Sequence, residues 1–246
     1  MPFSKSNAIF YNQFHSGVSI QKKIVERSSF TYRNVLNAIR KSIHLKMSSV
    51  LDYGCGVGTI DYYLASKGHK VLGVDISPKA IKSATESSKA IGVSENATFG
   101  LVGKEKGKKF DVVVCFEVIE HVSHDEGLLV YLYKCLNKGG TLILSTPSIN
   151  APLYKLGLAE GFDDCVGHLR RYDPKELTKM VQKAGFEVKE VIKTEGFVRN
   201  SLFVIKSLGF LVRFIKGPIS DLVTFVDDLT VKLFGESDIF VVAKKK

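Results

Sequence analysis

Cysteine, proline and long apolar runs are scarce in this chain of 246 residues, which has four cysteines and six prolines. No two of its cysteines (Cys55, Cys115, Cys135 and Cys165) stand at C-x-x-C spacing, so a zinc ribbon or a thioredoxin-type redox pair is disfavoured. Met1 to Phe10 lack the apolar run of a secretory signal peptide. We therefore expect a cytoplasmic protein with reduced thiols.

Internal repeats and proline-rich or serine-rich linkers are also missing from the chain. Hydrophobic residues make up 45% and charged residues 24% of it, which are ordinary globular values. They exclude a wholly disordered or collagen-like protein. The length suits one large α/β domain or two small ones, and we predict a single domain.

Acidic residues are rare near the N-terminus, and the excess positive charge is concentrated in a few segments. The formal net charge is +10, and residues 1–50 hold eight Lys and Arg against the single acid Glu26. The segment 101–110 and the final Lys244 to Lys246 add further positive charge. Two interpretations stay open: attraction to phosphates, nucleic acid or an anionic membrane surface, or a solvated surface that keeps the protein soluble.

Segments with the apolar pattern of strands alternate with segments that have the pattern of helices. The predicted strands are Ser48–Asp52, Val71–Asp75, Thr98–Val102, Phe110–Phe116, Thr141–Ser145, Phe186–Ile192 and Asp238–Ala243. The predicted helices are 20–46, Thr59–Lys67, Pro78–Ile91, Glu126–Leu136 and Pro174–Ala184. This alternation predicts an α/β fold with a doubly wound, seven-stranded, mostly parallel sheet, into which 147–172 and 196–235 are inserted.

A glycine-rich loop follows the first predicted strand, with the sequence Asp52-Tyr-Gly-Cys-Gly-Val-Gly58. Glycines let a backbone approach a ligand closely, and the helix that follows offers free N–H donors. Asp75 ends the next strand, where a carboxylate can bind both hydroxyls of a ribose. The loop lacks the G-x-G-x-x-G spacing of dinucleotide sites, and Asp52 before it suits a ligand with a cationic amino group.

Four blocks carry a family resemblance: VLDYGCGVG, VLGVDIS, FDVVVCFEVIEHV and LNKGGTLILSTPS. In this order and spacing, over residues 50–190, they resemble class I S-adenosylmethionine (SAM) dependent methyltransferases. The chain is most similar to the branch that contains the ubiquinone-biosynthesis O-methyltransferases and the type 11 methyltransferases. The fold that this implies is Rossmann-like, with an N-terminal helical lid and a helical insertion before the last strand.

The resemblance also implies a cofactor site. It places SAM against Gly54, Gly56 and Gly58, the SAM ribose on Asp75, the SAM amino end near Asp52, and Glu117 beside the cofactor. The chain departs from the family after the third strand, where the acid expected near the adenine is missing from Leu101-Val-Gly-Lys104 and none stands before Glu105. The adenine contact therefore stays open, with backbone groups as one candidate.

An E-x-x-E-H cluster, formed by Glu117, Glu120 and His121, ends the fourth predicted strand, and His168 follows later in GHLRRY. Two carboxylates and an imidazole can hold a divalent metal or act as a base. In the related ubiquinone and small-RNA methyltransferases such residues bind metal, which implies Glu117, Glu120, His121 and His168 as ligands of Mg²⁺ or another divalent ion. The catalytic candidates are then His121, His168 and Glu117. A metal-free histidine base and a structural role are the alternatives.

The segment Ser201 to Lys216 is apolar but is interrupted by Lys206, Arg213 and Lys216. Its length and charges disfavour a membrane span. If it is one helix, it is either a basic amphipathic helix that lies on a membrane or a lid or dimer contact that buries the same residues against protein. Both readings favour an acceptor with apolar bulk.

Together these features predict an enzyme that transfers methyl groups to the oxygen of a small hydrophobic or lipid-linked hydroxyl acceptor, with SAM as cofactor. The chain divides into a lid at 1–46, a SAM-binding core at 47–195, the insertion at 196–235, and the last strand with a basic tail at 236–246. Phe3, Phe10, Tyr11, Phe14 and Tyr32 are available to line the lid. The expected location is cytoplasmic, either free or peripheral at the inner membrane surface.

Two other functions stay open. The first is an RNA 2′-O-methyltransferase that uses the basic N-terminal segment to bind phosphates, although the chain has no recognised RNA-binding module. The second is a non-catalytic subunit of the same fold that binds a protein partner through 196–235. The sequence does not reveal the oligomeric state.

Overall fold

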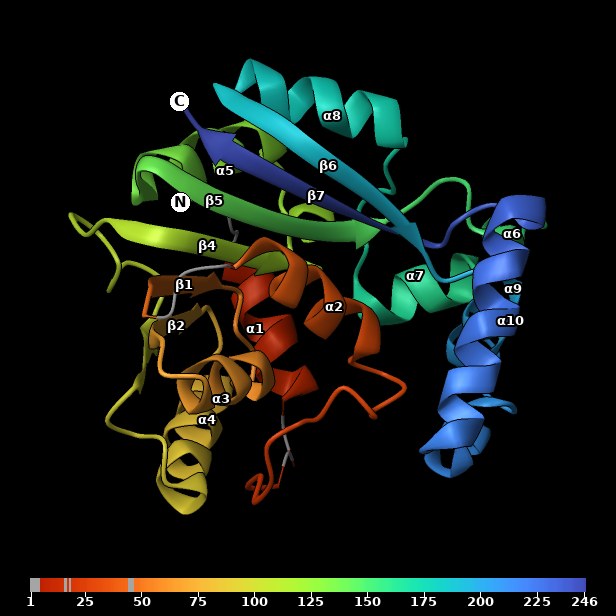
Figure 1. Cartoon of the computed structure of the whole chain (residues 1–246), viewed down its shortest axis with the longest axis horizontal. Coiled ribbons are helices and arrows are strands. Elements are labelled where there is room, and N and C mark those ends of the chain that lie inside the picture. Colours follow the sequence, from red (N-terminus) through yellow and green to blue (C-terminus); the bar gives the residue numbers. More distant parts are fainter. Residues whose placement is uncertain (1–4, 16, 18, 44–46) are drawn as a thin grey trace.

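The computed structural model describes residues 5–15, 17, 19–43 and 47–246, with side chains from residue 9 onward. Their strands form one seven-stranded sheet in the order β3-β2-β1-β4-β5-β7-β6 (Figure 1). The strands are β1 Ser49–Tyr53, β2 Lys70–Asp75, β3 Ala97–Leu101, β4 Phe110–Phe116, β5 Leu136–Pro147, β6 Phe186–Thr194 and β7 Asp238–Lys245. Only β7 runs antiparallel to its neighbours, which confirms the predicted α/β fold.

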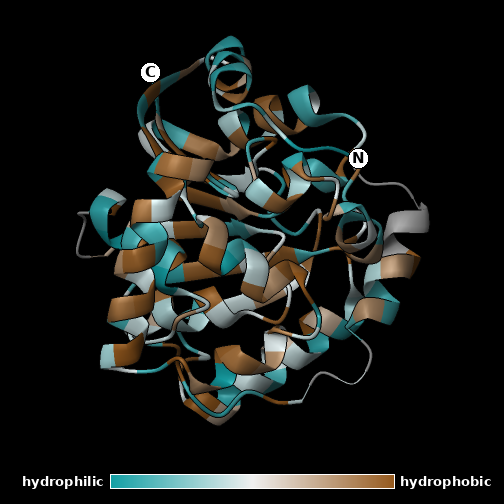
Figure 2. Ribbon diagram, turned by 90° about the vertical axis from the view of Figure 1, so that its right-hand side faces the viewer, coloured by the Kyte–Doolittle hydropathy of each residue, from teal (hydrophilic) through white to brown (hydrophobic). Residues whose placement is uncertain are grey.

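The central strands are apolar throughout because both faces of the sheet are covered. Successive side chains of a strand point to opposite faces. On β4, Val113 and Cys115 therefore join one core cluster and Val112 and Val114 join the other. Figure 2 shows the strands as largely hydrophobic and the covering helices as banded.

Two groups of helices cover the two faces. The helices are α1 Lys5–Phe14, α2 Arg33–Ser42, α3 Thr59–Ser66, α4 Pro78–Ile91, α5 Asp125–Cys135, α6 Pro152–Lys155, α7 Glu160–Val166, α8 Pro174–Lys183, α9 Phe197–Val204 and α10 Pro218–Phe234, with single-turn or short 3₁₀ segments η1 Ile119–His121 and η2 Gly209–Phe214. Helices α2, α3 and α4 bury residues in one core, and α5 and α8 bury residues in the other. Ser77 and Asp173 cap α4 and α8 through their side chains, as their positions in the sequence predict.

The helix predicted at 20–46 is wrong for most of its length, since the helix covers only Arg33–Ser42 and residues 44–46 lie outside the described part. The backbone N–H of Gln21 donates to Ser87 Oγ and its side-chain amide donates to Thr59 Oγ1. Ile24 still packs against the core. Apolar residues spaced three or four apart are thus buried here by a segment without helical hydrogen bonds.

The single helix expected at 201–216 is also wrong. Helix α9 ends at Val204, a turn follows, and η2 begins at Gly209, a residue that disfavours continuous helix. The long helix of this insertion is α10, which begins with Pro218 at its first position. Within the described ranges, no helix is long and apolar enough to cross a bilayer.

Candidate active site

A cavity of about 580 Å³ lies at the edge of the sheet where the parallel strands end. Segments that follow β1, β2, β3, β4 and β6 line it, and the antiparallel β7 contributes its first residue. The strand order reverses between β1 and β4, and ligands of such sheets bind in the crevice at this point. The size is that of a ligand-binding site.

The glycine loop forms one wall of the cavity. Gly54 and Gly56 both have positive φ angles, +88° and +53°, that side chains disfavour. A Cβ atom on Gly54 would lie 2.3 Å from Val118 Cγ2, so only glycine fits there. The Asp75 carboxylate accepts hydrogen bonds from the N–H groups of Gly56 (2.9 Å) and Ser77 (2.8 Å) and is thereby held at the cavity.

The predicted cofactor residues divide into two groups. Gly54, Gly56, Asp75 and Glu117 line the cavity. Asp52 and Gly58 stand outside its lining, because Asp52 is buried beneath the loop and Gly58 packs against Tyr62 and Phe99. A Cβ on Gly58 would lie 2.8 Å from the Tyr62 hydroxyl, so this glycine serves the packing of loop, helix and strand.

A second carboxyl that the sequence reasoning missed, Asp61 on α3, lies beside Asp52. Burial raises the pKa of Asp52 to about 7 and that of Asp61 well above its ordinary value. The negative charge of Asp52 raises the pKa of Asp61 further, so this buried pair keeps a proton to a higher pH than ordinary carboxyls do.

This pair makes the ligand-free protein less stable as the pH rises. The pKa values of both carboxyls are higher in the folded than in the unfolded state. From about pH 4 upward the folded state therefore binds more protons than the unfolded state does, and the free energy of unfolding falls as the pH rises through about 7. We expect Asp61→Asn to raise the free energy of unfolding by about 1–3 kcal/mol at pH 8 and by less at pH 5. Urea denaturation at both pH values measures this. Asp111→Asn is the control and should lower the free energy of unfolding, because hydrogen bonds from Ser49 hold the pKa of Asp111 below its ordinary value.

Among the described residues, none of those that line the cavity directly after β3 is acidic. Val102 lines it, whereas the carboxylate of Glu105 is buried and accepts hydrogen bonds from Gly103 N and the Tyr131 hydroxyl. Glu105 therefore stabilises the turn after β3, and the acid found there in related proteins has no counterpart in the lining.

Helix α1 lies over the glycine loop. Its Tyr11 and Phe14 line the cavity, and the next residue, His15, approaches Gly56. Asn12 anchors the helix, since its Oδ1 accepts a hydrogen bond from Lys79 N at the start of α4 (3.3 Å). Tyr32 also lines the cavity, and Phe3 lies outside the described residues.

The E-x-x-E-H segment is a sharp turn rather than a regular helix. Glu117 has a φ angle of +53°, which is strained for a residue with a side chain, and η1 follows it. The Glu117 carboxylate accepts a hydrogen bond from Ser145 Oγ (2.5 Å), and Glu120 Oε2 accepts one from Thr146 Oγ1 (2.9 Å). Neighbouring strand β5 thus orients both acids.

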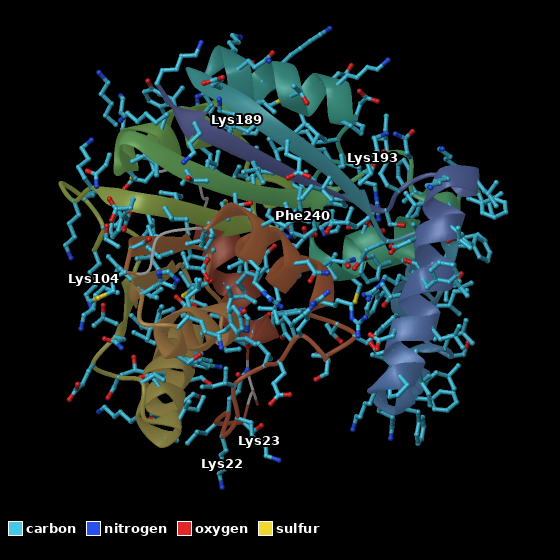
Figure 3. All side chains as sticks on the ribbon, in the orientation of Figure 1. Lys22, Lys23, Lys104, Lys189, Lys193 and Phe240 are labelled. Atoms are coloured by element: carbon cyan, nitrogen blue, oxygen red, sulfur yellow. The ribbon has the colours of Figure 1, made fainter. Side chains whose placement is uncertain are left out.

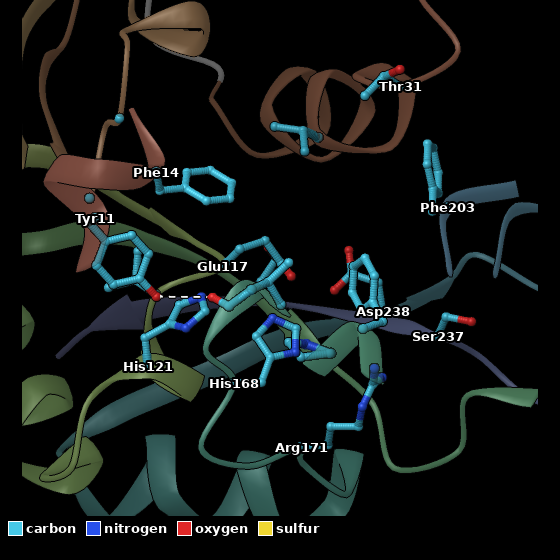
Figure 4. Close-up of a pocket in the computed structure, with 18 of the residues that line it drawn as sticks. Tyr11, Phe14, Thr31, Glu117, His121, His168, Arg171, Phe203, Ser237 and Asp238 are labelled. Atoms are coloured by element: carbon cyan, nitrogen blue, oxygen red, sulfur yellow. Dashed lines mark hydrogen bonds between the residues drawn. The ribbon is translucent and has the colours of Figure 1, made fainter. Parts of the chain in front are cut away.

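Glu120, His121 and His168 converge on one point. One ligand atom from each lies within 4.8 Å of the others, and Glu120 Oε1 is 3.6 Å from His121 Nε2 and 3.9 Å from His168 Nε2. Glu120 is fully buried, and its Oε1 accepts no hydrogen bond from the described residues. Figure 4 shows the two imidazoles beside one another, with Tyr11 and Phe14 on one side of the pocket and Phe203 on the other.

The other ring nitrogen of each histidine is held by a neighbour. His121 Nδ1 donates to the carbonyl of Gly167 (2.9 Å), and His168 Nδ1 donates to Asp163 Oδ1 (2.8 Å). Arg171 donates two hydrogen bonds to the Asp163 carboxylate, of 2.8 and 2.6 Å. Both Nε2 atoms therefore face Glu120. Burial lowers the pKa of His121 to about 4, so its ring is neutral near pH 7.

Two further acids in the cavity were not predicted from the sequence. Glu195 follows β6 with a φ angle of +62°, and Asp238 begins β7. Burial raises the pKa of Glu195 to about 7 and raises the pKa of Asp238 and Glu117. The charge of Glu117 also raises the pKa of Asp238. Glu117, Glu195 and Asp238 therefore line a part of the cavity that we call its reacting end. Apolar Phe203 and Val204 also line the cavity.

Sheet order, glycine loop and the acid after β2 define a class I SAM-dependent methyltransferase. The chain belongs to the methyltransferase-domain family, whose model matches residues 27–191. It therefore has the cofactor chemistry of that family.

Curated relatives and solved structures agree with this assignment. The chain is 29% identical over 188 residues to the ubiquinone biosynthesis O-methyltransferase of Nitrosospira multiformis, covering 71% of this chain and 76% of the relative. Its fold resembles the magnesium protoporphyrin IX methyltransferase of Synechocystis with bound S-adenosylhomocysteine (TM-score 0.61, 18% identity, 98% and 95% covered). It also resembles the cyclase SpnF (TM-score 0.64, 14% identity, 98% and 92% covered). At these identities the two structures support the fold alone.

Proposed function

We propose that the enzyme methylates a hydroxyl oxygen of an acceptor that binds beside Glu120, His121 and His168, with the assistance of a divalent cation. The observation that carries this proposal is the convergence of these three side chains at the cavity that the cofactor loop also lines. The names of the curated relatives, ubiquinone biosynthesis O-methyltransferases, support oxygen as the methylated atom.

The donor set fits a metal ion. Glu120 Oε1 is a buried oxygen that accepts no hydrogen bond from the described residues, and both histidines donate their second N–H to a carbonyl or carboxylate, as metal-bound histidines do. Two imidazoles and one carboxylate suit Mn²⁺ or Zn²⁺ better than Mg²⁺, which prefers oxygen ligands. Glu117, proposed from the sequence as a fourth ligand, is already bonded to Ser145.

Each participant then has a defined task. A bound divalent ion would lower the pKa of the acceptor hydroxyl, and SAM would supply the electrophilic methyl group. Asp75 and the glycine loop hold the cofactor. His168 Nε2 would bind the ion, and Asp163 keeps its ring oriented. The hydroxyl proton would then pass to a carboxylate of the cavity or to solvent, whereas without an ion His168 Nε2 itself would accept it. Tyr11 and Phe14 of α1 exclude water, and positioning contributes most of the rate.

The acceptor that fits this cavity has a polar, hydroxyl-bearing end and an apolar remainder. Glu117, Glu195 and Asp238 surround the first, and Phe203 and Val204 contact the second. A small hydrophobic or lipid-linked molecule meets both conditions. An RNA 2′-hydroxyl is less favoured, since Phe203 and Val204 offer no partner to the phosphates on either side of it.

Calorimetric titration of Mn²⁺, Zn²⁺ and Mg²⁺ into protein saturated with S-adenosylhomocysteine tests the proposal. We expect one ion to bind per chain. Glu120→Ala and His168→Ala should each weaken this binding by about 10-fold to 100-fold. Glu117→Gln should retain it. His124→Ala is the matched control, because this exposed histidine stands only three residues from His121.

If no ion binds while S-adenosylhomocysteine does, metal assistance is wrong and a histidine alone is the base. The cofactor site would be unaffected by that result. If His124→Ala weakens the binding as much as His168→Ala does, the metal lies elsewhere.

A further inference from the structure

Helix α10 presents a continuous apolar face to solvent. Its exposed residues recur at helical spacing along one side, and Phe225 and Leu233 are 62% and 75% exposed. We call this face the α10 ridge; it consists of Leu222, Phe225, Val226, Leu229 and Leu233. Figure 3 shows side chains that project from α10 away from the rest of the protein. Isolated monomers rarely expose so much contiguous apolar surface unless it binds something.

The ridge is held outward by a buried polar link on the other side of the helix. Asp227 is fully buried and accepts hydrogen bonds from Gly196 N (3.0 Å) and Arg199 N (2.9 Å) at the start of α9. The Arg199 guanidinium also pairs with Asp227, at 3.7 Å. Rotating α10 to bury the ridge would break these contacts, so its exposure is built into the fold.

Exposed positive charge is present on α10 and on the segment that precedes it. Segment η2 ends four residues before α10 and exposes Phe210 and Phe214. The exposed cations of these segments are Lys206, Arg213, Lys216 and Lys232. The nearby acids are mostly neutralised, since Asp221 pairs with Arg33 at 2.6 Å and Asp227 with Arg199. Only Asp228 is left among the acids of α10 to oppose these cations.

We propose that the α10 ridge and η2 dock on the surface of an anionic lipid bilayer. Exposed aromatic and aliphatic side chains flanked by lysine and arginine are the pattern of helices that lie in the interface of such membranes. A second copy of the chain fits less well, because two cationic faces would repel one another.

The surface lies one helix away from the cavity. Helix α9 packs against α10 and lines the cavity through Asn200, Phe203 and Val204. A lipid-linked acceptor could therefore enter from the bilayer along α9. In this respect the inference rests on the proposed function, although membrane docking itself needs neither cofactor nor acceptor.

Co-sedimentation of the full chain with vesicles tests the docking. We expect binding to vesicles of phosphatidylcholine with phosphatidylglycerol and much weaker binding to phosphatidylcholine alone. The double variant Phe225→Ser/Leu229→Ser should bind at least tenfold more weakly. Lys216→Glu and Lys232→Glu should each weaken binding by about fivefold or more, the effect of one charge near such a surface.

Matched controls are Val130→Ser, an apolar residue that is 40% exposed on α5, and Lys138→Glu, an exposed lysine near the start of β5. Circular dichroism and S-adenosylhomocysteine binding verify that each variant is folded. Absence of vesicle binding by the wild type, or equal losses in the controls, would overturn the inference. So would a concentration-dependent dimer that the double variant abolishes. His168→Ala should bind vesicles normally, which separates this result from the fate of the proposed function.

Discussion

Replacing Asp75 with alanine should weaken the binding of S-adenosylhomocysteine by about a hundredfold or more. The carboxylate is fixed by the N–H groups of Gly56 and Ser77, and it lines the cavity. A ribose donates two hydroxyls to such a carboxylate, and each hydrogen bond to a charged group contributes about 1.5–3 kcal/mol. Loss of both therefore costs two orders of magnitude or more in the dissociation constant, which calorimetry measures.

Asp75→Asn distinguishes lost ligand contacts from a disturbed loop. The amide keeps the size of the side chain and one acceptor oxygen, but its NH2 group faces the N–H of either Gly56 or Ser77. We therefore expect a loss of roughly tenfold, between wild type and alanine. Unchanged affinity in both variants would show that the ribose does not lie at the end of β2. An equal loss in both, together with lower thermal stability, would mean that Asp75 acts only by holding Gly56 and Ser77.

The fold could be predicted because each central strand is a short apolar run bounded by turn residues. Phe110–Phe116 was predicted to the residue, and the caps Ser77 and Asp173 marked two helix starts. The errors arose where tertiary contacts replaced local ones. The segment around Gln21 obtains its hydrogen bonds from Ser87 and Thr59, which no local pattern reveals.

The site was predictable only in part for a related reason. Residues that follow parallel strands, such as Asp75 and Glu120, could be assigned to one edge from the alternation of strands and helices. Asp238 reaches the same edge because β7 runs antiparallel, and a single sequence does not reveal strand direction. Asp61 was missed because its partner Asp52 is close only after the loop folds over α3.

Replacing His168 with alanine should slow methyl transfer by about 10²-fold to 10⁴-fold while leaving S-adenosylhomocysteine affinity unchanged. Activation of the acceptor hydroxyl contributes a factor of this size, and His168 supplies it as one of the proposed metal ligands or, where no ion binds, as the base. The fold should survive, because Asp163 keeps two bonds to Arg171 when the imidazole is absent. The rate is measured as the initial rate of S-adenosylhomocysteine formation with catechol as a probe acceptor. Calorimetry measures the affinity for S-adenosylhomocysteine.

Asp163→Asn shows whether His168 works through its orientation. The amide offers a weaker acceptor to Nδ1–H than the carboxylate does, so the rate should fall by a smaller factor than in His168→Ala. His124→Ala should have the wild-type rate, since this exposed histidine lies outside the cavity lining. A wild-type rate in His168→Ala would contradict the proposed mechanism. Because the hydrogen bonds of Asp75 do not involve His168, that outcome would leave the cofactor site intact. It would direct attention to Glu117 and Asp238, two interacting carboxyls that line the same cavity.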